Sequence, residues 1–61
     1  MDKERFKKIR KQAGYTQVEL SEYLGGNRNQ GTVSRYESGE HKIERGIAAQ
    51  MLFLERITND K

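Results

Sequence analysis

The side chains best suited to chemistry lie between Asn29 and Arg35, where amide, hydroxyl and guanidinium groups occur at helical spacing. Glutamine and asparagine can form paired hydrogen bonds with adenine, arginine with guanine, and a threonine methyl group can contact the methyl group of thymine. A merely solvated helix would favour glutamate and lysine at Gln30 and Arg35. We therefore predict a helix whose exposed face contacts base edges through Asn29, Gln30, Gly31, Thr32 and Arg35.

Three of these residues could have a role other than a side-chain contact with a base. Asn29 is also a good N-cap, so its side chain could serve the helix end instead of a base. Thr32 could face a phosphate group. Gly31 carries no side chain and so permits close approach of the backbone to a ligand.

Enzymatic chemistry finds no support in the sequence. His41 is the single histidine and lies between Glu40 and Lys42, and the chain has no cysteine. A catalytic or metal site needs partners at defined spacing, and no cluster of histidine, cysteine and aspartate is present. Gly25 and Gly26 are not followed by the G-K-[ST] of a phosphate-binding loop. We predict no enzymatic activity, no metal and no cofactor.

Composition favours a small helical domain with an anionic partner. The 61 residues are 33% apolar and 34% charged, which suits a thin core, and the net charge of +3 favours polyanions. No segment approaches the ~18 apolar residues of a membrane span, and the N-terminus has no apolar signal region. We expect a single domain over 1–61, no membrane association and a cytoplasmic location.

Helix start and stop signals divide the chain into four segments. Thr16 and Glu19 have the spacing of a capping box, and Gly14 and Gly39 are placed to end helices. Lys3 is interpreted as part of a solvated face. The prediction is an all-α fold, a compact four- or five-helix bundle, with helices over about 2–13, 16–24, 29–38 and 44–57.

The segment from 44 to 57 is apolar nearly all round. Ile47, Met51 and Leu54 form one stripe at helical spacing, and further apolar residues lie outside it. A chain of this length has too little other mass to cover every stripe. We therefore predict a homodimer through the C-terminal helix, with an interface formed by Leu52, Phe53 and Ile57.

Several motifs together resemble a known family. The phage-repressor/Cro-type (XRE-like) helix-turn-helix DNA-binding family has the pattern I-R-x-x-R-G-L-T-Q, E-L-A, L-G and T-I-S-R-W-E-x-G. This chain is similar over about two-thirds of its length, with IRKQAGYTQ at 9–17, ELS at 19–21, LG at 24–25 and TVSRYESG at 32–39. It departs from the pattern between Leu24 and Asn29, where it has two residues more than the common turn.

The resemblance implies a sequence-specific double-stranded DNA-binding transcriptional regulator. Its expected form is a dimeric repressor that reads the major groove of a palindromic operator, in a bacterial cell or a phage-infected host. The segment over 29–38 would be the recognition helix, with phosphate contacts beside it. On the family's pattern and on charge, we expect those contacts at Gln17, Arg28, Ser38 and Lys42.

Three further residues take roles from the resemblance. Arg45 corresponds to a basic position that can reach the adjacent minor groove, and a solvated surface role is equally open. Arg10 and Glu37 correspond to positions that the family joins by a buried ion pair. That pair would position the recognition helix and would not contact DNA.

Two other functions remain open. The chain could be the antitoxin of a toxin–antitoxin pair, in which case the last helix would also contact a toxin. It could instead be a helical protein-interaction module without DNA binding, although such a module would not be expected to keep Gln30 and Arg35 on one face.

Overall fold

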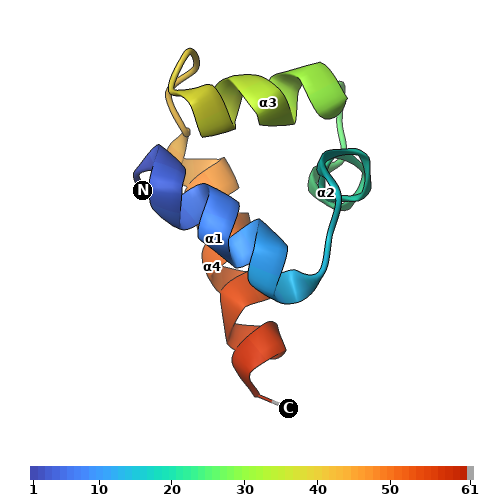
Figure 1. The fold of residues 1–61 in the computed structure, drawn as a ribbon, viewed down its shortest axis with the longest axis vertical. Coiled ribbons are helices and arrows are strands. Elements are labelled where there is room, and N and C mark those ends of the chain that lie inside the picture. The colour runs from blue at the N-terminus through green and yellow to red at the C-terminus, as the bar shows by residue number, and fades with distance from the viewer. Residues whose placement is uncertain (61) are drawn as a thin grey trace.

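The computed structural model describes residues 1–60, which form four α-helices joined by short loops (Figure 1). The predicted all-α class is confirmed, and no strand occurs in the described part of the chain. Each predicted start lies one residue early, because the residue chosen is the N-cap and the helix proper begins after it. The helices are α1 (Lys3–Ala13), α2 (Gln17–Leu24), α3 (Gln30–Ser38) and α4 (Arg45–Asn59).

Side-chain caps fix the starts of the first three helices. The Asp2 carboxylate accepts a hydrogen bond from the Arg5 amide at 2.7 Å. At α2, Thr16 accepts from the Glu19 amide at 3.1 Å, and Glu19 accepts from the Thr16 amide at 2.9 Å. This pair is the capping box that the sequence predicts. Each such cap satisfies an amide that the helix itself leaves without a partner.

The last helix ends later than predicted. The predicted end at Ile57 followed the last apolar residue, whereas α4 continues to Asn59. The Asp60 amide still donates to the Arg56 carbonyl at 3.1 Å. Backbone hydrogen bonding extends the helix beyond the point where its apolar pattern stops, through Thr58 and Asn59, which are poor helix formers by themselves.

The core is built from all four helices. The Phe6 and Tyr36 rings lie 5.5 Å apart between α1 and α3, and the α4 residues at its centre form the stripe that the sequence predicts. Complete burial of large aliphatic and aromatic side chains is the main favourable term in a fold of this size. The buried apolar residues are Phe6, Ile9, Leu20, Leu24, Val33, Tyr36, Ile47, Met51 and Leu54.

The packing order places α3 at one end of the molecule. α1 packs against both α3 and α4, and α2 packs against α3. Figure 1 shows α3 across one end of the long axis, with the C-terminal end of α4 at the other. The exposed side of α3 is therefore an end surface of a particle that measures 31 × 20 × 18 Å.

The longer turn between α2 and α3 is accommodated by two glycines. Gly25 and Gly26 have φ values of 71° and 68°, a region that other residues rarely adopt. The Gly25 amide also donates to the Ser21 carbonyl at 3.0 Å, which ends α2. The two extra residues thus lie in the loop, and α2 and α3 still pack together.

Two hydrogen bonds join α2 to α4 beside this turn. The Tyr23 hydroxyl donates to the Gln50 carbonyl at 3.4 Å, and the Gln50 side chain donates to the Leu24 carbonyl at 3.5 Å. The Tyr15 ring lies 6.0 Å from that of Tyr23. Burial raises the pKa of the Tyr23 phenol, and the neighbouring Tyr15 raises it further.

Candidate nucleic-acid interface

The exposed face of α3 is polar and carries a single cation. Val33 and Tyr36 are 0% and 3% exposed, so they fix the side of the helix that faces the core. Thr32 is half-buried at the edge of the exposed face. The exposed residues of α3 are Gln30, Gly31, Ser34, Arg35 and Ser38.

Asn29 acts as the N-cap of α3. Its Oδ1 accepts from the Thr32 amide at 3.1 Å and from the Thr32 hydroxyl at 3.4 Å. A Cβ atom on Gly31 would lie 3.2 Å from the same oxygen, so a larger residue there would crowd the cap. Of the two interpretations of Asn29, the capping role is the one that the structure displays, and its amide nitrogen is still available for a base.

A buried ion pair joins the last turn of α1 to the end of α3. Arg10 Nε donates to Glu37 Oε2 at 2.5 Å, and Arg10 Nη2 donates to Glu37 Oε1 at 3.3 Å. The third guanidinium nitrogen, Nη1, donates to the Tyr15 carbonyl at 2.8 Å. The two side chains are 12% and 6% exposed. Arg10 and Glu37 thus hold α3 against the body of the domain, away from its exposed face.

Gln17 connects this ion pair to the exposed face. Its amide nitrogen donates to Glu37 Oε1 at 3.1 Å, and its amide oxygen accepts from Gln30 Nε2 at 3.2 Å. The sequence offered Gln17 as a phosphate contact. The structure adds a second role, because Gln17 also touches the first residue of α3.

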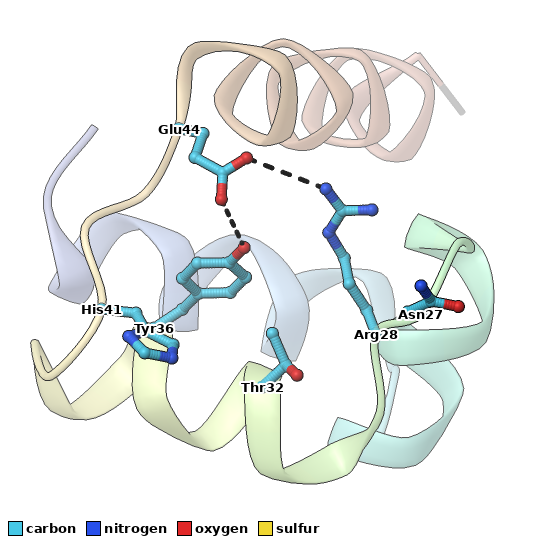
Figure 2. Close-up of a pocket in the computed structure, with 6 residues that line it drawn as sticks. All are labelled: Asn27, Arg28, Thr32, Tyr36, His41 and Glu44. Atoms are coloured by element: carbon cyan, nitrogen blue, oxygen red, sulfur yellow. Dashed lines mark hydrogen bonds and ion pairs between the residues drawn. The ribbon is translucent and has the colours of Figure 1, made fainter.

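Arg28 turns back toward α4. Its Nη2 lies 3.8 Å from Glu44 Oε2, and its Nη1 donates to the Gly25 carbonyl at 3.4 Å. Figure 2 shows Arg28 and Tyr36 pointing toward Glu44, and the Tyr36 hydroxyl donates to Glu44 Oε1 at 3.4 Å. Arg28 must leave Glu44 to make the phosphate contact predicted for it. The shallow hollow around these groups is lined by Asn27, Arg28, Thr32, Tyr36, His41 and Glu44.

The C-terminal end of α3 carries an exposed ion pair and a bonded serine. Arg35 Nε lies 3.5 Å from Glu40 Oε2, and the two side chains are 52% and 67% exposed. The Ser38 hydroxyl donates to the Arg35 carbonyl at 3.2 Å and accepts from the Glu40 amide at 3.3 Å. Arg35 is therefore free to exchange a solvent-exposed carboxylate for another partner at little cost.

Two exposed residues that could belong to the interface, Lys3 and Ser34, were not predicted from the sequence. Lys3, interpreted as solvated, crosses the end of α3: its Nζ lies 3.5 Å from where a Cβ atom on Gly39 would be. It lines a hollow that Lys42 also lines. No sequence signal places Lys3 beside the end of α3. Ser34 is exposed one turn beyond Gln30, and the helical spacing alone would have indicated it.

The remaining predicted residues lie on α4. Arg45 is its first residue and is exposed. None of the helices in the described residues is long and apolar enough to cross a membrane, and residues 1–60 contain no group of three metal-ligating side chains. The large apolar residues that α4 leaves exposed are Leu52 (45%), Phe53 (59%) and Ile57 (44%).

Two short helices joined by a turn, with polar side chains on the open face of the second, define a helix-turn-helix protein. A family model described as helix-turn-helix matches residues 6–54, and the chain belongs to this family. The resemblance to the Cro/repressor type is thereby confirmed. Comparisons with curated proteins and with solved structures give no match. Membership makes the protein a DNA-binding regulator.

Proposed function

We propose that the protein is a dimeric repressor that reads a palindromic operator through the major groove of double-stranded DNA. The observation that carries this proposal is the composition of the exposed face of α3. That face presents an amide, a backbone without a side chain and a guanidinium along one helix edge, at Gln30, Gly31 and Arg35. Such groups match the donors and acceptors of base edges.

Base readout is assigned to the first turns of α3. A recognition helix enters the major groove with its N-terminal residues toward the bases. Gln30 offers a donor and an acceptor to adenine, and Arg35 offers a paired donor to guanine. Asn29 and Thr32 stand at the same end of the helix, where Asn29 can offer its amide nitrogen and the half-buried Thr32 is assigned a contact with the methyl group of thymine.

Phosphate contacts are assigned to both flanks of α3. Gln17 begins α2, whose N-terminal amides and dipole favour an anion. Beyond the other end of α3, Lys42 and Lys3 supply cations within one hollow. Ser38 is exposed beside them, and Arg45 is available for an adjacent groove. Such contacts position a protein on the duplex without selecting sequence.

The apolar face of α4 supports dimerisation. Three large apolar side chains there are 44–59% exposed, and a contiguous apolar patch on a small soluble protein is typical of an interface. In Figure 1, α3 lies at one end of the long axis and the C-terminal end of α4 at the other, so a two-fold axis along this direction would bring both copies of α3 to the same end of a dimer. One duplex can then meet two recognition helices.

Selection of bound sites from a random duplex pool tests this function. We expect enriched sites with inverted symmetry, because a two-fold dimer imposes its symmetry on the operator. Sites without symmetry would contradict the dimer, and no enrichment with no salt-dependent affinity would favour a protein-interaction module. An antitoxin would select DNA in the same way but would also form a stable complex with a second protein through α4.

A further inference from the structure

We propose, building on the DNA-binding function above, that the buried ion pair dictates which base Gln30 reads. Three hydrogen bonds run from Arg10 through Glu37 and Gln17 to Gln30, from the interior to the exposed face. Glu37 is the positioning residue in this chain of bonds. It fixes the orientation of two glutamine amides and so makes adenine the preferred partner of Gln30 over guanine.

The orientation follows from the kinds of group involved. The Glu37 carboxylate is held by two guanidinium N–H groups, at 2.5 and 3.3 Å, and a carboxylate only accepts hydrogen bonds. Gln17 must therefore turn its NH₂ group toward Glu37, and the 3.1 Å contact has this form. The opposite orientation would set the Gln17 oxygen against a carboxylate oxygen.

The orientation of the Gln30 side-chain amide is fixed in the same way. With its NH₂ group on Glu37, Gln17 presents an oxygen to Gln30, which must donate to it; the 3.2 Å contact again has this form. Gln30 then retains one N–H and its oxygen for DNA. Adenine offers N7 as an acceptor and its amino group as a donor, so both groups find partners.

Guanine is disfavoured by this arrangement. It presents two acceptors in the major groove, N7 and O6, and needs two donors. Gln30 can supply two N–H groups outward only if its oxygen turns to Gln17. That requires an NH₂ group from Gln17, and hence an oxygen against Glu37. The Glu37 carboxylate therefore disfavours guanine at the position that Gln30 reads, although Glu37 itself does not contact the DNA.

The base preference at the position read by Gln30 tests this inference. That position is the one at which Gln30→Ala loses preference in sites selected from a random pool. We expect the unaltered protein to prefer adenine over guanine there by roughly tenfold or more. Gln17→Met removes the link but leaves the ion pair intact, and should lower this ratio several-fold. Loss of a phosphate contact alone would weaken all sequences equally.

Glu37→Gln makes a stronger test because it can reverse the chain of bonds. The new amide can keep its oxygen on Arg10 and present NH₂ to Gln17, so that Gln30 turns both N–H groups outward. Binding to guanine should then rise relative to adenine. Glu55→Gln is the matched control, because it removes the charge from another Arg–Glu pair, with Arg5 at 3.0 Å, on the exposed surface. It should leave the ratio unchanged.

An adenine-to-guanine ratio that is unchanged in Gln17→Met overturns the inference, whether or not Glu37→Gln folds. If Gln30→Ala keeps the base preference of the unaltered protein at every position of the site, the inference is overturned as well. Failure of the unaltered protein to bind any duplex contradicts the proposed function instead. The bonds are then tested in the free protein by the side-chain amide NMR signals of Gln17 and Gln30. Both should shift in Glu37→Gln and neither in Glu55→Gln, and unmoved signals would refute the relay.

Discussion

Arg10 and Glu37 stand 27 positions apart in the chain and meet at 2.5 Å in a nearly closed site beneath α3. Taking two charges out of water costs about as much as their attraction returns, so the pair adds little net stability. Its importance lies in what happens when one partner is lost.

Arg10→Met should therefore destabilise the domain strongly. It leaves the Glu37 carboxylate buried without its main partner, which costs ~3–5 kcal/mol in comparable cases. Urea unfolding followed by circular dichroism measures the change. Arg5→Met removes an exposed pair and should cost under ~1 kcal/mol. Equal effects of the two substitutions would contradict the burial of the Arg10 pair.

Arg35→Ala should relax selectivity at one base position of each half-site and weaken the preferred site by ~1–3 kcal/mol. The reason is that Arg35 is assigned to a guanine, and it gives up only its exposed ion pair with Glu40 when it binds DNA. Fluorescence anisotropy with the selected site and with single-base variants measures both effects. Retention of full selectivity would show that α3 presents a different edge to the groove.

Glu40→Gln should strengthen binding to all sequences. Glu40 lies beside Arg35 at the end of α3, where its charge repels phosphate and competes for the guanidinium. The gain should be larger at low salt and shrink as salt rises, because exposed charges are screened. Anisotropy titrations at several salt concentrations test this. Weaker binding in the variant would place this end of α3 away from the backbone.

Lys42→Ala and Lys3→Ala should each weaken binding to every duplex about equally and flatten its salt dependence. A dimer with six or more phosphate contacts loses about 10³-fold in affinity between 50 and 200 mM salt. Each substitution removes one such contact per subunit. Lys8→Ala, on an exposed part of α1, serves as the charge-matched control. A changed base preference in either variant would show that the lysine reads sequence.

Phe53→Lys should convert the proposed dimer to a monomer. A charge at the side chain that is 59% exposed in the isolated subunit prevents pairing of the apolar faces without disturbing the core. The melting temperature of the unaltered protein should rise with concentration, and that of the variant should not. Sedimentation at high micromolar concentration decides the matter: a monomeric unaltered protein would exclude this interface.

Much of the fold could be predicted because its signals are local. Thr16, Asn29 and Asp2 each cap a helix within three residues of themselves, and Gly39 ends α3 with a φ of 86°. The buried stripe of α4 follows from helical spacing alone. The end of α4 was misplaced because backbone hydrogen bonds carried the helix beyond its last apolar residue, and each predicted start lay one residue early, at the N-cap.

The site could be predicted only in part. The exposed face of α3 follows from one helix, and Gln30, Gly31 and Arg35 are exposed on it, whereas their contacts with bases stay a prediction. The direction of Arg28 depends on Glu44, the N-cap of α4, and the reach of Lys3 depends on how α1 crosses α3. The bonds from Arg10 through Glu37 to Gln17 require α1, α3 and α2 at once. These relationships arise from tertiary packing, for which the spacing of residues along the chain carries no signal.

The core is closed by residues from opposite ends of the chain, Phe6 and Ile9 from α1 and Ile47, Met51 and Leu54 from α4. During synthesis, α3 emerges before the residues that complete its support. A helix of nine residues is marginal in water by itself. The nascent chain can therefore complete the core around α3 only after Leu54 has left the ribosome.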